Sequence, residues 1–263
     1  MDGSVELSLT GKTALVTGGS RGIGAATVRL FRQAGARVFF NYRSAEIQAK
    51  KLVTECGGES WCRAAGQELA TPEDGKKLVQ AAVDAFGRLD CLVVNHGVWP
   101  PEDVPISSMS DAQWRSTLGI NLDSTFGLVR ATVAQMQQQP PIAGVRGSIV
   151  LVASTAAQRG EAFHADYAAS KGALVSMTKS LSSELAGEGI YCNCVAPGWV
   201  DTEMSAAALT DPETSKRVLA TIPLNRPARV EEIAGPILFL CTPFAGFISG
   251  EILNVNGGAV LAG

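Results

Sequence analysis

Short apolar segments alternate with longer helix-periodic segments along almost the whole chain, and this alternation limits the possible folds more than any other feature. The apolar segments have the length of strands and are rich in Val, Ile, Leu, Phe and Cys. Most of them lack polar alternation, which is typical of strands covered by helices on both faces. We therefore predict an α/β fold, a doubly wound parallel sheet of Rossmann type flanked by helices on both faces, in a single domain over residues 1–263.

The predicted elements follow one another with little interruption. Strands are expected at residues 13–17, 37–42, 91–95, 148–153, 191–196 and 252–255, with a weaker candidate at 60–63. Helices are expected at residues 23–34, 45–56, 72–86, 111–138, 167–186 and 230–240. The stretch 199–229 breaks the alternation before the last helix, and long inserts at such places often cover a site. We expect residues 199–229 to form a substrate lid.

Composition and charge argue against several classes of protein. The 46% apolar and 18% charged content indicates a chain that buries a large core. The net charge is −3 and there is no block of Lys or Arg, whereas a nucleic-acid partner requires a basic stripe. Residues 1–10 contain no apolar signal-peptide segment, and the apolar runs are too short for a membrane span. We expect a cytoplasmic protein that binds neither nucleic acid nor membrane.

The cysteines and histidines do not form a metal-binding pattern. The six cysteines include no C-x-x-C pair. Cys91, Cys192 and Cys194 lie within apolar strand-like runs, where a thiol acts as a small hydrophobic group. His96 and His164 are the only histidines, so a Cys/His ligand set is incomplete. We expect six structural cysteines and no metal.

A glycine-rich segment, TGGSRGIG at residues 17–24, joins the first predicted strand to the first predicted helix. Gly18 allows a tight turn, Gly22 lets the backbone approach a pyrophosphate, and Gly24 permits close packing of the helix. The diphosphate of a dinucleotide would then meet the unpaired amides at the helix N-terminus. The predicted cofactor contacts in this segment are Gly18, Ser20, Arg21, Gly22, Ile23 and Gly24.

The spacing T-G-x-x-x-G-x-G resembles the short-chain dehydrogenase/reductase family, particularly its 3-oxoacyl-[acyl-carrier-protein] reductase-like members. Nearly the whole chain agrees with this resemblance. The run DCLVVNHG at residues 90–97 is similar to the family's N-N-A-G strand end, but it has Val94 and His96 in place of the first Asn and the Ala. The other matching residues are Asn121, the S…Y-x-x-x-K set of Ser154, Tyr167 and Lys171, the P-G-x-x-x-T set of Pro197, Gly198 and Thr202, and Asn256-Gly257-Gly258.

The residue types at Ser154, Tyr167 and Lys171 suit carbonyl chemistry. Tyr167 and Lys171 are four residues apart in a predicted helix, so their side chains share one face. A phenol titrates near pH ~10, and a nearby ammonium and an oxidised nicotinamide should lower that pKa towards the working pH. Ser154 follows a strand at the ligand-binding edge, where its hydroxyl can donate to a carbonyl oxygen that gains negative charge.

The resemblance implies a definite role for each of these residues. In reduction, the nicotinamide delivers a hydride to the carbonyl carbon, Tyr167 protonates the oxygen, and Ser154 orients and polarises it. Lys171 lowers the pKa of Tyr167 and hydrogen-bonds the nicotinamide ribose. Asn121 holds a water molecule that links Lys171 to bulk solvent.

The cofactor is expected to be NADP(H), with NAD(H) as the alternative. An acidic residue at the end of the second strand would favour NAD(H), but Tyr42 occupies that position. Arg43 follows it, and Arg21 lies in the glycine segment, so two guanidinium groups can converge on a 2′-phosphate. The resemblance adds Glu68 and Leu69 near the adenine, with Glu in place of the family's Asp. Its remaining cofactor contacts are Asn95, Gly97, Tyr167, Lys171, Pro197, Gly198, Val200 and Thr202.

The substrate residues are expected to be Ser154, His164 and Trp199, with Trp99 as a further candidate and no account of His96. The first hypothesis is an NADPH-dependent reductase of a free ketone. The alternatives are a 3-oxoacyl-[acyl-carrier-protein] reductase, a polyol or alcohol dehydrogenase, and a dinucleotide-binding sensor without activity. Residues 137–141 and 186–189, at the ends of two long helices, offer no basic side chain for an acidic carrier protein. By resemblance those helices, 111–138 and 167–186, pair between subunits of a homotetramer or homodimer.

Overall fold

The computed structural model describes residues 6–261 and contains a seven-stranded sheet in the order β3-β2-β1-β4-β5-β6-β7. Every neighbouring pair of strands is parallel. The strands are β1 (Thr13–Val16), β2 (Arg37–Tyr42), β3 (Cys62–Gly66), β4 (Cys91–Val94), β5 (Gly147–Val152), β6 (Ile190–Pro197) and β7 (Ile252–Val255). The prediction of a doubly wound parallel sheet in a single domain is confirmed.

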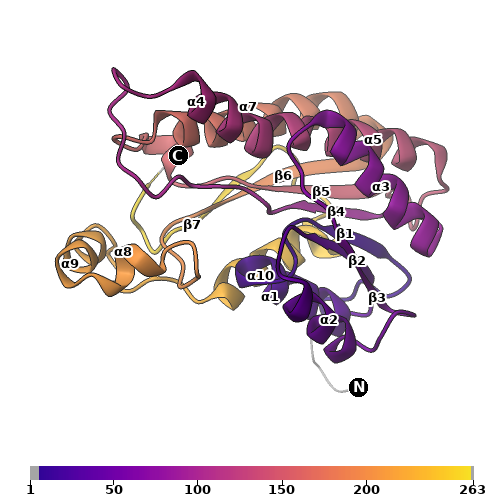
Figure 1. Ribbon diagram of the computed structural model, residues 1–263. Coiled ribbons are helices and arrows are strands. Elements are labelled where there is room, and N and C mark those ends of the chain that lie inside the picture. The colour runs from indigo at the N-terminus through magenta and orange to yellow at the C-terminus, as the bar shows by residue number, and fades with distance from the viewer. Residues whose placement is uncertain (1–5, 262–263) are drawn as a thin grey trace.

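Helices cover both faces of this sheet, as Figure 1 shows. α1, α2 and α10 lie on one face, and α3, α4, α5 and α7 lie on the other. The helices are α1 (Gly22–Gln33), α2 (Glu46–Glu55), α3 (Pro72–Phe86), α4 (Asp111–Leu118), α5 (Ser124–Gln138), α6 (Ala156–Arg159), α7 (Ala165–Leu185), α8 (Ala206–Thr210), α9 (Pro212–Ala220) and α10 (Val230–Leu240). Within residues 6–261, no helix combines the length and the apolarity needed to cross a bilayer.

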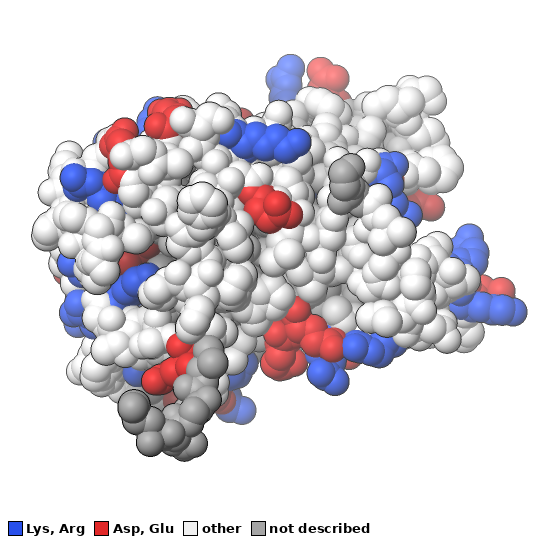
Figure 2. Space-filling model, turned by 180° about the vertical axis from the view of Figure 1, so that it is seen from behind, with Lys and Arg blue, Asp and Glu red and all other residues white. Residues whose placement is uncertain are grey.

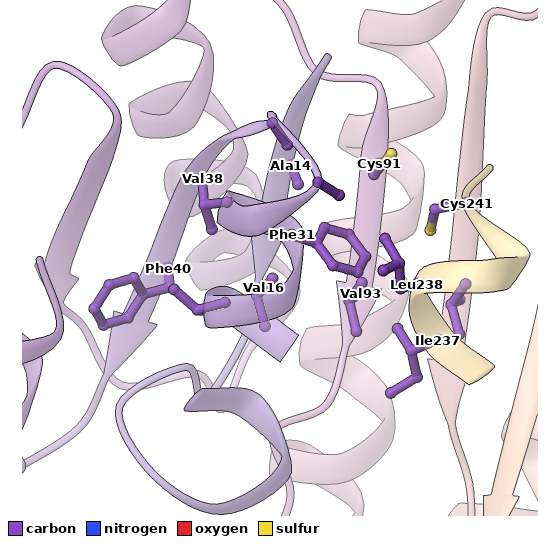
Figure 3. Close-up of a cluster of buried hydrophobic side chains, with 14 of the residues drawn as sticks. Ala14, Val16, Phe31, Val38, Phe40, Cys91, Val93, Ile237, Leu238 and Cys241 are labelled. Atoms are coloured by element: carbon purple, nitrogen blue, oxygen red, sulfur yellow. The ribbon is translucent and has the colours of Figure 1, made fainter. Parts of the chain in front are cut away.

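Most strand residues are apolar because successive side chains enter two different cores. In β1, Ala14 and Val16 belong to the core under α1 and α10, whereas Leu15 belongs to the core under α3, α5 and α7. Figure 3 shows the first core, where Phe31 of α1 packs with Val93 of β4 and Leu238 of α10. Each large side chain buried in this way contributes about 1.5–3 kcal/mol. All six cysteines are free and buried.

Local signals place the helix ends. α3 begins after Thr71, whose side chain accepts a hydrogen bond from the amide of Asp74 at 3.3 Å while the Asp74 carboxylate bonds the Thr71 amide in return. Pro72 takes the first helical position. α3 ends at Gly87, whose φ of 81° is in the left-handed region that favours glycine.

Three predicted elements differ from the structure. The edge strand lies at Cys62–Gly66 rather than at 60–63, because residues 58–61 form a turn closed by hydrogen bonds to the Gly58 carbonyl. The predicted helix 111–138 consists of α4, a π-helical segment (Gly119–Asp123) and α5. Residues 199–229 contain the two short helices α8 and α9, which project from the body of the molecule in Figure 1. Of the N-terminal stretch 1–10, residues 1–5 lie outside the described part.

The strand order creates a crevice at one edge of the sheet. The chain leaves β1 towards β2 and β3 and then returns to place β4 on the other side of β1. The connections after β1 and β4 therefore diverge at their carboxyl ends, and ligands of open α/β sheets bind at such a point. The glycine segment follows β1, residues 95–97 follow β4, Ser154 follows β5 and Gly198 follows β6. The fold thus brings all of these to the same edge.

Candidate active site

The glycine segment forms a cradle in which Gly24 leaves no room for a side chain. A Cβ atom on Gly24 would lie 2.1 Å from the Gly18 carbonyl oxygen, so α1 can approach the turn only with glycine at this position. Arg21, the residue at the N-cap of α1, makes no side-chain capping bond. The first amides of α1 therefore lack a side-chain acceptor, which suits the binding of a cofactor diphosphate.

Asn41, on β2, fixes the shape of this cradle. Its side-chain oxygen accepts a hydrogen bond from the Gly18 amide at 2.9 Å, and its amide nitrogen donates to the Gln67 carbonyl at 2.8 Å. Asn95, after β4, supports the other side by donating to the Thr17 carbonyl at 3.0 Å. The sequence analysis did not identify Asn41, although a buried polar residue in an otherwise apolar strand was a visible signal.

Ser154, Tyr167 and Lys171 converge beside the cradle. Tyr167 and Lys171 lie on one face of α7, and the Lys171 Nζ is 5.9 Å from the centre of the Tyr167 ring. Lys171 donates a hydrogen bond to the Val152 carbonyl of β5 at 2.9 Å. Asp166 fixes the start of α7 by accepting a 2.7 Å hydrogen bond from Thr117 of α4. The strand β5 and the helix α7 thus hold the three side chains in one wall of the cleft.

Burial dominates the acid–base properties of this group. It raises the pKa of Tyr167 to about 12, although a hydrogen bond from Ser154 acts in the opposite direction. It also lowers the pKa of Lys171 to about 8. In the protein without its cofactor, desolvation of the phenolate therefore dominates the pKa of Tyr167, and the expected lowering of that pKa by the Lys171 ammonium and an oxidised nicotinamide stays a prediction.

Asn121 lies in the π-helical segment, behind the cleft wall. Its side-chain oxygen accepts a hydrogen bond from the Val98 amide at 2.8 Å, and its nitrogen donates to the Val98 carbonyl and to Ser170, each at 3.0 Å. A Cβ atom on Gly97 would lie 3.1 Å from the Asn121 oxygen and 3.3 Å from the Lys171 Nζ. Gly97 therefore allows Asn121 and Lys171 to approach the same point.

Two arginines lie at the other end of the cleft, and each has a glutamate partner. Arg21 forms an ion pair with Glu203, and the Arg43 Nη1 lies 3.9 Å from a Glu68 oxygen. All four side chains are more than half exposed, so these pairs contribute little to stability and can be replaced by a ligand. Tyr42 ends β2 immediately before Arg43. This end of the cleft can therefore accept a phosphate.

One cleft of about 590 Å³ unites these groups. Its wall includes every residue predicted for catalysis, cofactor or substrate except Gly24, Asn121 and His164, all of which lie behind it. Trp99 and Trp199 both line it. The sequence analysis missed Glu161 and Arg159, which also lie in the wall and belong to no recognised motif.

His164 does not face the cleft, contrary to the prediction of a substrate-binding role. Its side chain is buried, and its ring nitrogens lie 3.1 Å from the Ala162 carbonyl oxygen and 2.9 Å from the Pro100 carbonyl oxygen. Trp99 stacks on the ring with 4.8 Å between the ring centres. Because both nitrogens contact backbone carbonyls, the His164 ring acts on loop structure and not on the substrate.

The helix ends used to argue against a carrier protein also lie away from the cleft. Gln137 in the last turn of α5 donates to Glu188, just after α7, and also accepts through its carbonyl from Arg146, which precedes β5. This is the amino-terminal edge of β5, whereas Ser154 follows its carboxyl-terminal end. The charge at these helix ends is therefore no guide to the charge at the mouth of the cleft in the same chain.

The fold and this cleft define a dinucleotide-dependent oxidoreductase. A family model described as enoyl-(acyl carrier protein) reductase matches residues 18–260. The chain is 35% identical over 256 residues to L-rhamnose 1-dehydrogenase (NAD(P)(+)) of Azotobacter vinelandii, covering 95% of this chain and 97% of that one. It is 35% identical over 252 residues to 3-oxoacyl-[acyl-carrier-protein] reductase FabG of Vibrio cholerae, covering 96% and 98%.

Solved structures agree with these relatives. A short-chain dehydrogenase/reductase from Brucella melitensis, titled glucose/ribitol dehydrogenase, superposes with a TM-score of 0.88 at 34% identity, covering 98% of this chain and 100% of that one. A blue fluorescent protein from a metagenomic library, solved in complex with NADPH, gives a TM-score of 0.86 at 35% identity, covering 97% and 100%. The chain belongs to the short-chain dehydrogenase/reductase family. It is an NAD(P)-dependent oxidoreductase that acts on CH–OH groups.

Proposed function

We propose that this enzyme interconverts a free ketone and a secondary alcohol with NADP(H), and that Tyr167 transfers the proton. The observation that carries the proposal is the convergence of Ser154, Tyr167 and Lys171 in one cleft with the glycine cradle. The exposed Arg21 and Arg43 at the far end support the choice of NADP(H), because both can exchange a glutamate for a 2′-phosphate. The NADPH-bound relative agrees with this cofactor.

The side chains divide the chemistry of reduction among them. Bound NADPH supplies a hydride to the carbonyl carbon. Tyr167, whose raised pKa keeps it protonated at neutral pH, donates its proton to the carbonyl oxygen. Ser154 donates a hydrogen bond to that oxygen as negative charge develops. Lys171 would hold the nicotinamide ribose of the cofactor through its ammonium group, and Asn121 orients the neighbouring Val98 backbone.

A 3-oxoacyl-[acyl-carrier-protein] reductase is the second candidate, since one relative carries that name. The charges around the cleft favour the first candidate. Its wall contains Arg21, Arg43 and Arg159 together with Glu68, Glu161 and Glu203, so the three arginines are matched by three glutamates, and the remaining basic residue of the wall, Lys171, is buried. An acidic carrier protein is steered by an excess of exposed positive charge, which these matched residues do not supply.

Tyr167→Phe tests the proposed role of Tyr167. The variant keeps the ring in its packed position and removes the proton donor, so turnover with NADPH and a ketone should fall by about 10² or more. NADPH binding, measured by titration of cofactor fluorescence, should be nearly unchanged. A variant that retains half of the wild-type turnover would show that Tyr167 is not the proton donor.

A further inference from the structure

Glu161 lies in the cleft wall with Tyr167, Trp99 and Trp199, and the chemistry above does not use it. We propose that Glu161 binds a hydroxyl group of the substrate, and that the substrates are neutral hydroxylated carbonyl compounds and the matching polyols. This inference rests on the proposed carbonyl–alcohol chemistry and adds the substrate class to it.

The loop that carries Glu161 is held in a strained conformation. It connects α6 to α7, and its Phe163 has a φ of 67°, a left-handed backbone that is unfavourable for a bulky residue. His164 fixes the loop through the Ala162 and Pro100 carbonyls, and the Phe163 carbonyl accepts from the Val104 amide at 3.2 Å. Such strain persists where surrounding contacts impose a particular geometry, and here that geometry places Glu161 in the cleft.

One carboxylate oxygen of Glu161 remains available to a ligand. Oε1 accepts a hydrogen bond from the Trp99 indole nitrogen at 3.2 Å. In the described part of the chain, Glu161 forms no ion pair with Lys or Arg. The side chain is half-buried, and this burial raises its pKa. A partly desolvated carboxylate is stabilised by added hydrogen-bond donors, which the hydroxyl groups of a substrate can supply.

The groups around Glu161 favour a neutral donor over a cation or an anion. Arg159 and His164 both favour the charged form of Glu161, and Asp103 opposes it. Arg159 and Glu161 carry opposite charges in the same wall, so a ligand with an ammonium or a carboxylate group is attracted by one of them and repelled by the other. A hydroxyl group can donate a hydrogen bond to Glu161 without being repelled by Arg159.

The two tryptophans complete a surface suited to a small ring. Trp99 and Trp199 meet edge to face, with 6.3 Å between their ring centres and an interplanar angle of 79°. Their apolar faces can pack on the C–H groups of a ring, while Glu161 holds its hydroxyl. Trp99 is itself fixed by stacking on His164 and by its bond to Glu161. The tryptophans, the carboxylate and the loop therefore form one connected unit.

The test compares four ketones of similar size with wild-type enzyme and the Glu161→Gln variant. These are cyclohexanone, 2-hydroxycyclohexanone, 4-oxocyclohexanecarboxylate and 4-aminocyclohexanone. kcat/KM is measured for each with NADPH, and every result is expressed as a ratio to cyclohexanone, so that effects on the shared chemical step cancel. Glu102→Gln is the matched control, because Glu102 is exposed on a neighbouring loop and lies outside the cleft wall. Thermal unfolding verifies that each variant folds.

We expect the wild-type enzyme to prefer the hydroxyketone to cyclohexanone by about tenfold or more, as for a hydrogen bond to a charged group. Glu161→Gln should reduce the hydroxyketone-to-cyclohexanone ratio at least severalfold and should raise the ratio for the oxo acid. Glu102→Gln should change neither ratio. Activity on cyclohexanone with no preference for the hydroxyketone, or a preference for the aminoketone, overturns the inference and leaves the proposed function intact. Failure to oxidise NADPH with any of the four overturns both.

Discussion

Tyr167 and Lys171 lie one turn apart on α7, and both side chains are almost completely buried. Burial disfavours the charged form of each, so it raises the pKa of the phenol and lowers the pKa of the ammonium. At neutral pH the phenol therefore holds the proton that the proposed reduction requires. In the proposed mechanism the residue type identifies the proton donor, whereas the depth of burial sets the pH range over which its proton is available.

Arg43 also acts at the scale of a single residue, because its effect depends on one charge. It directly follows β2, its one ion pair within residues 6–261 is with Glu68, and we expect it to bind the 2′-phosphate of NADPH. Arg43→Ala should lower kcat/KM for NADPH by at least about tenfold, or about 1.4 kcal/mol, and that for NADH much less. The control is Arg115→Ala, because Arg115 is also an exposed arginine but lies on α4. Equal losses for both cofactors would show that Arg43 does not distinguish them.

At the scale of elements, His96 connects β1, the end of β4 and the π-helical segment. Its Nδ1 lies 2.8 Å from the Thr17 hydroxyl, and its Nε2 lies 2.8 Å from the Ser124 hydroxyl and 3.1 Å from the Ile120 carbonyl. Burial lowers the pKa of His96 to about 3, so the ring is neutral at physiological pH. His96 therefore joins the segment that carries Asn121 to the centre of the sheet.

This placement predicts a pH-dependent stability. The folded pKa of about 3 lies below the unfolded value of 6.5, so the unfolded chain takes up a proton first as the pH falls below 6.5. His96→Ala removes the hydrogen bonds of the ring to Thr17 and Ser124 and leaves a cavity in their place, so it should cost about 1–3 kcal/mol at pH 7. The difference in unfolding free energy between wild type and His96→Ala should shrink by up to about 1.4 kcal/mol for each pH unit below 6.5.

Urea unfolding of wild type and His96→Ala at pH 7 and pH 5 measures this change. Other titrating groups affect both proteins equally, so the difference between them isolates His96. If the two proteins differ in unfolding free energy by the same amount at both pH values, His96 is not a neutral, buried side chain.

At the scale of the whole molecule, charge is spread without a dominant sign. Acidic and basic side chains are interspersed on the face shown in Figure 2, and much of that face carries neither. Since the arginines of the cleft wall are also matched by glutamates, we expect no large preference for a 3-oxoacyl group on acyl carrier protein over the same group on a short thioester. The measurement is kcat/KM for both at several salt concentrations. A large preference for the carrier-bound form that falls steeply with salt would favour the second candidate, a 3-oxoacyl-[acyl-carrier-protein] reductase of fatty-acid synthesis.

Assembly is the second property at this scale. We propose a homotetramer or homodimer that pairs the outer faces of α5 and α7, as the family resemblance implies. Phe126 on α5 is 46% exposed and is therefore available to such an interface. Light scattering after size exclusion should give a mass of two or four chains, and Phe126→Asp should shift it towards one. A monomeric wild-type protein would contradict the proposal.

Much of this protein is determined within short stretches of its sequence. The alternation of strand and helix patterns, the glycine segment and the four-residue spacing of Tyr167 and Lys171 depend on neighbouring residues alone. Parallel connectivity then brings the carboxyl ends of the strands to one edge, so the order of the motifs was enough to predict the fold and most of the cleft wall. The predicted roles of the catalytic residues remain to be tested by the variants above.

Other features arise only when distant segments meet. The bond from Gly18 to Asn41 joins residues 23 positions apart, and His96 reaches Ser124 across 28 positions. His164 is buried because Pro100 and Trp99, more than 60 residues away, close over its ring, and the same contacts place Glu161 in the cleft. The pKa of Tyr167 likewise follows from desolvation by the packed core. Burial and long-range hydrogen bonds are properties of the assembled tertiary structure, which is why local patterns could not reveal them.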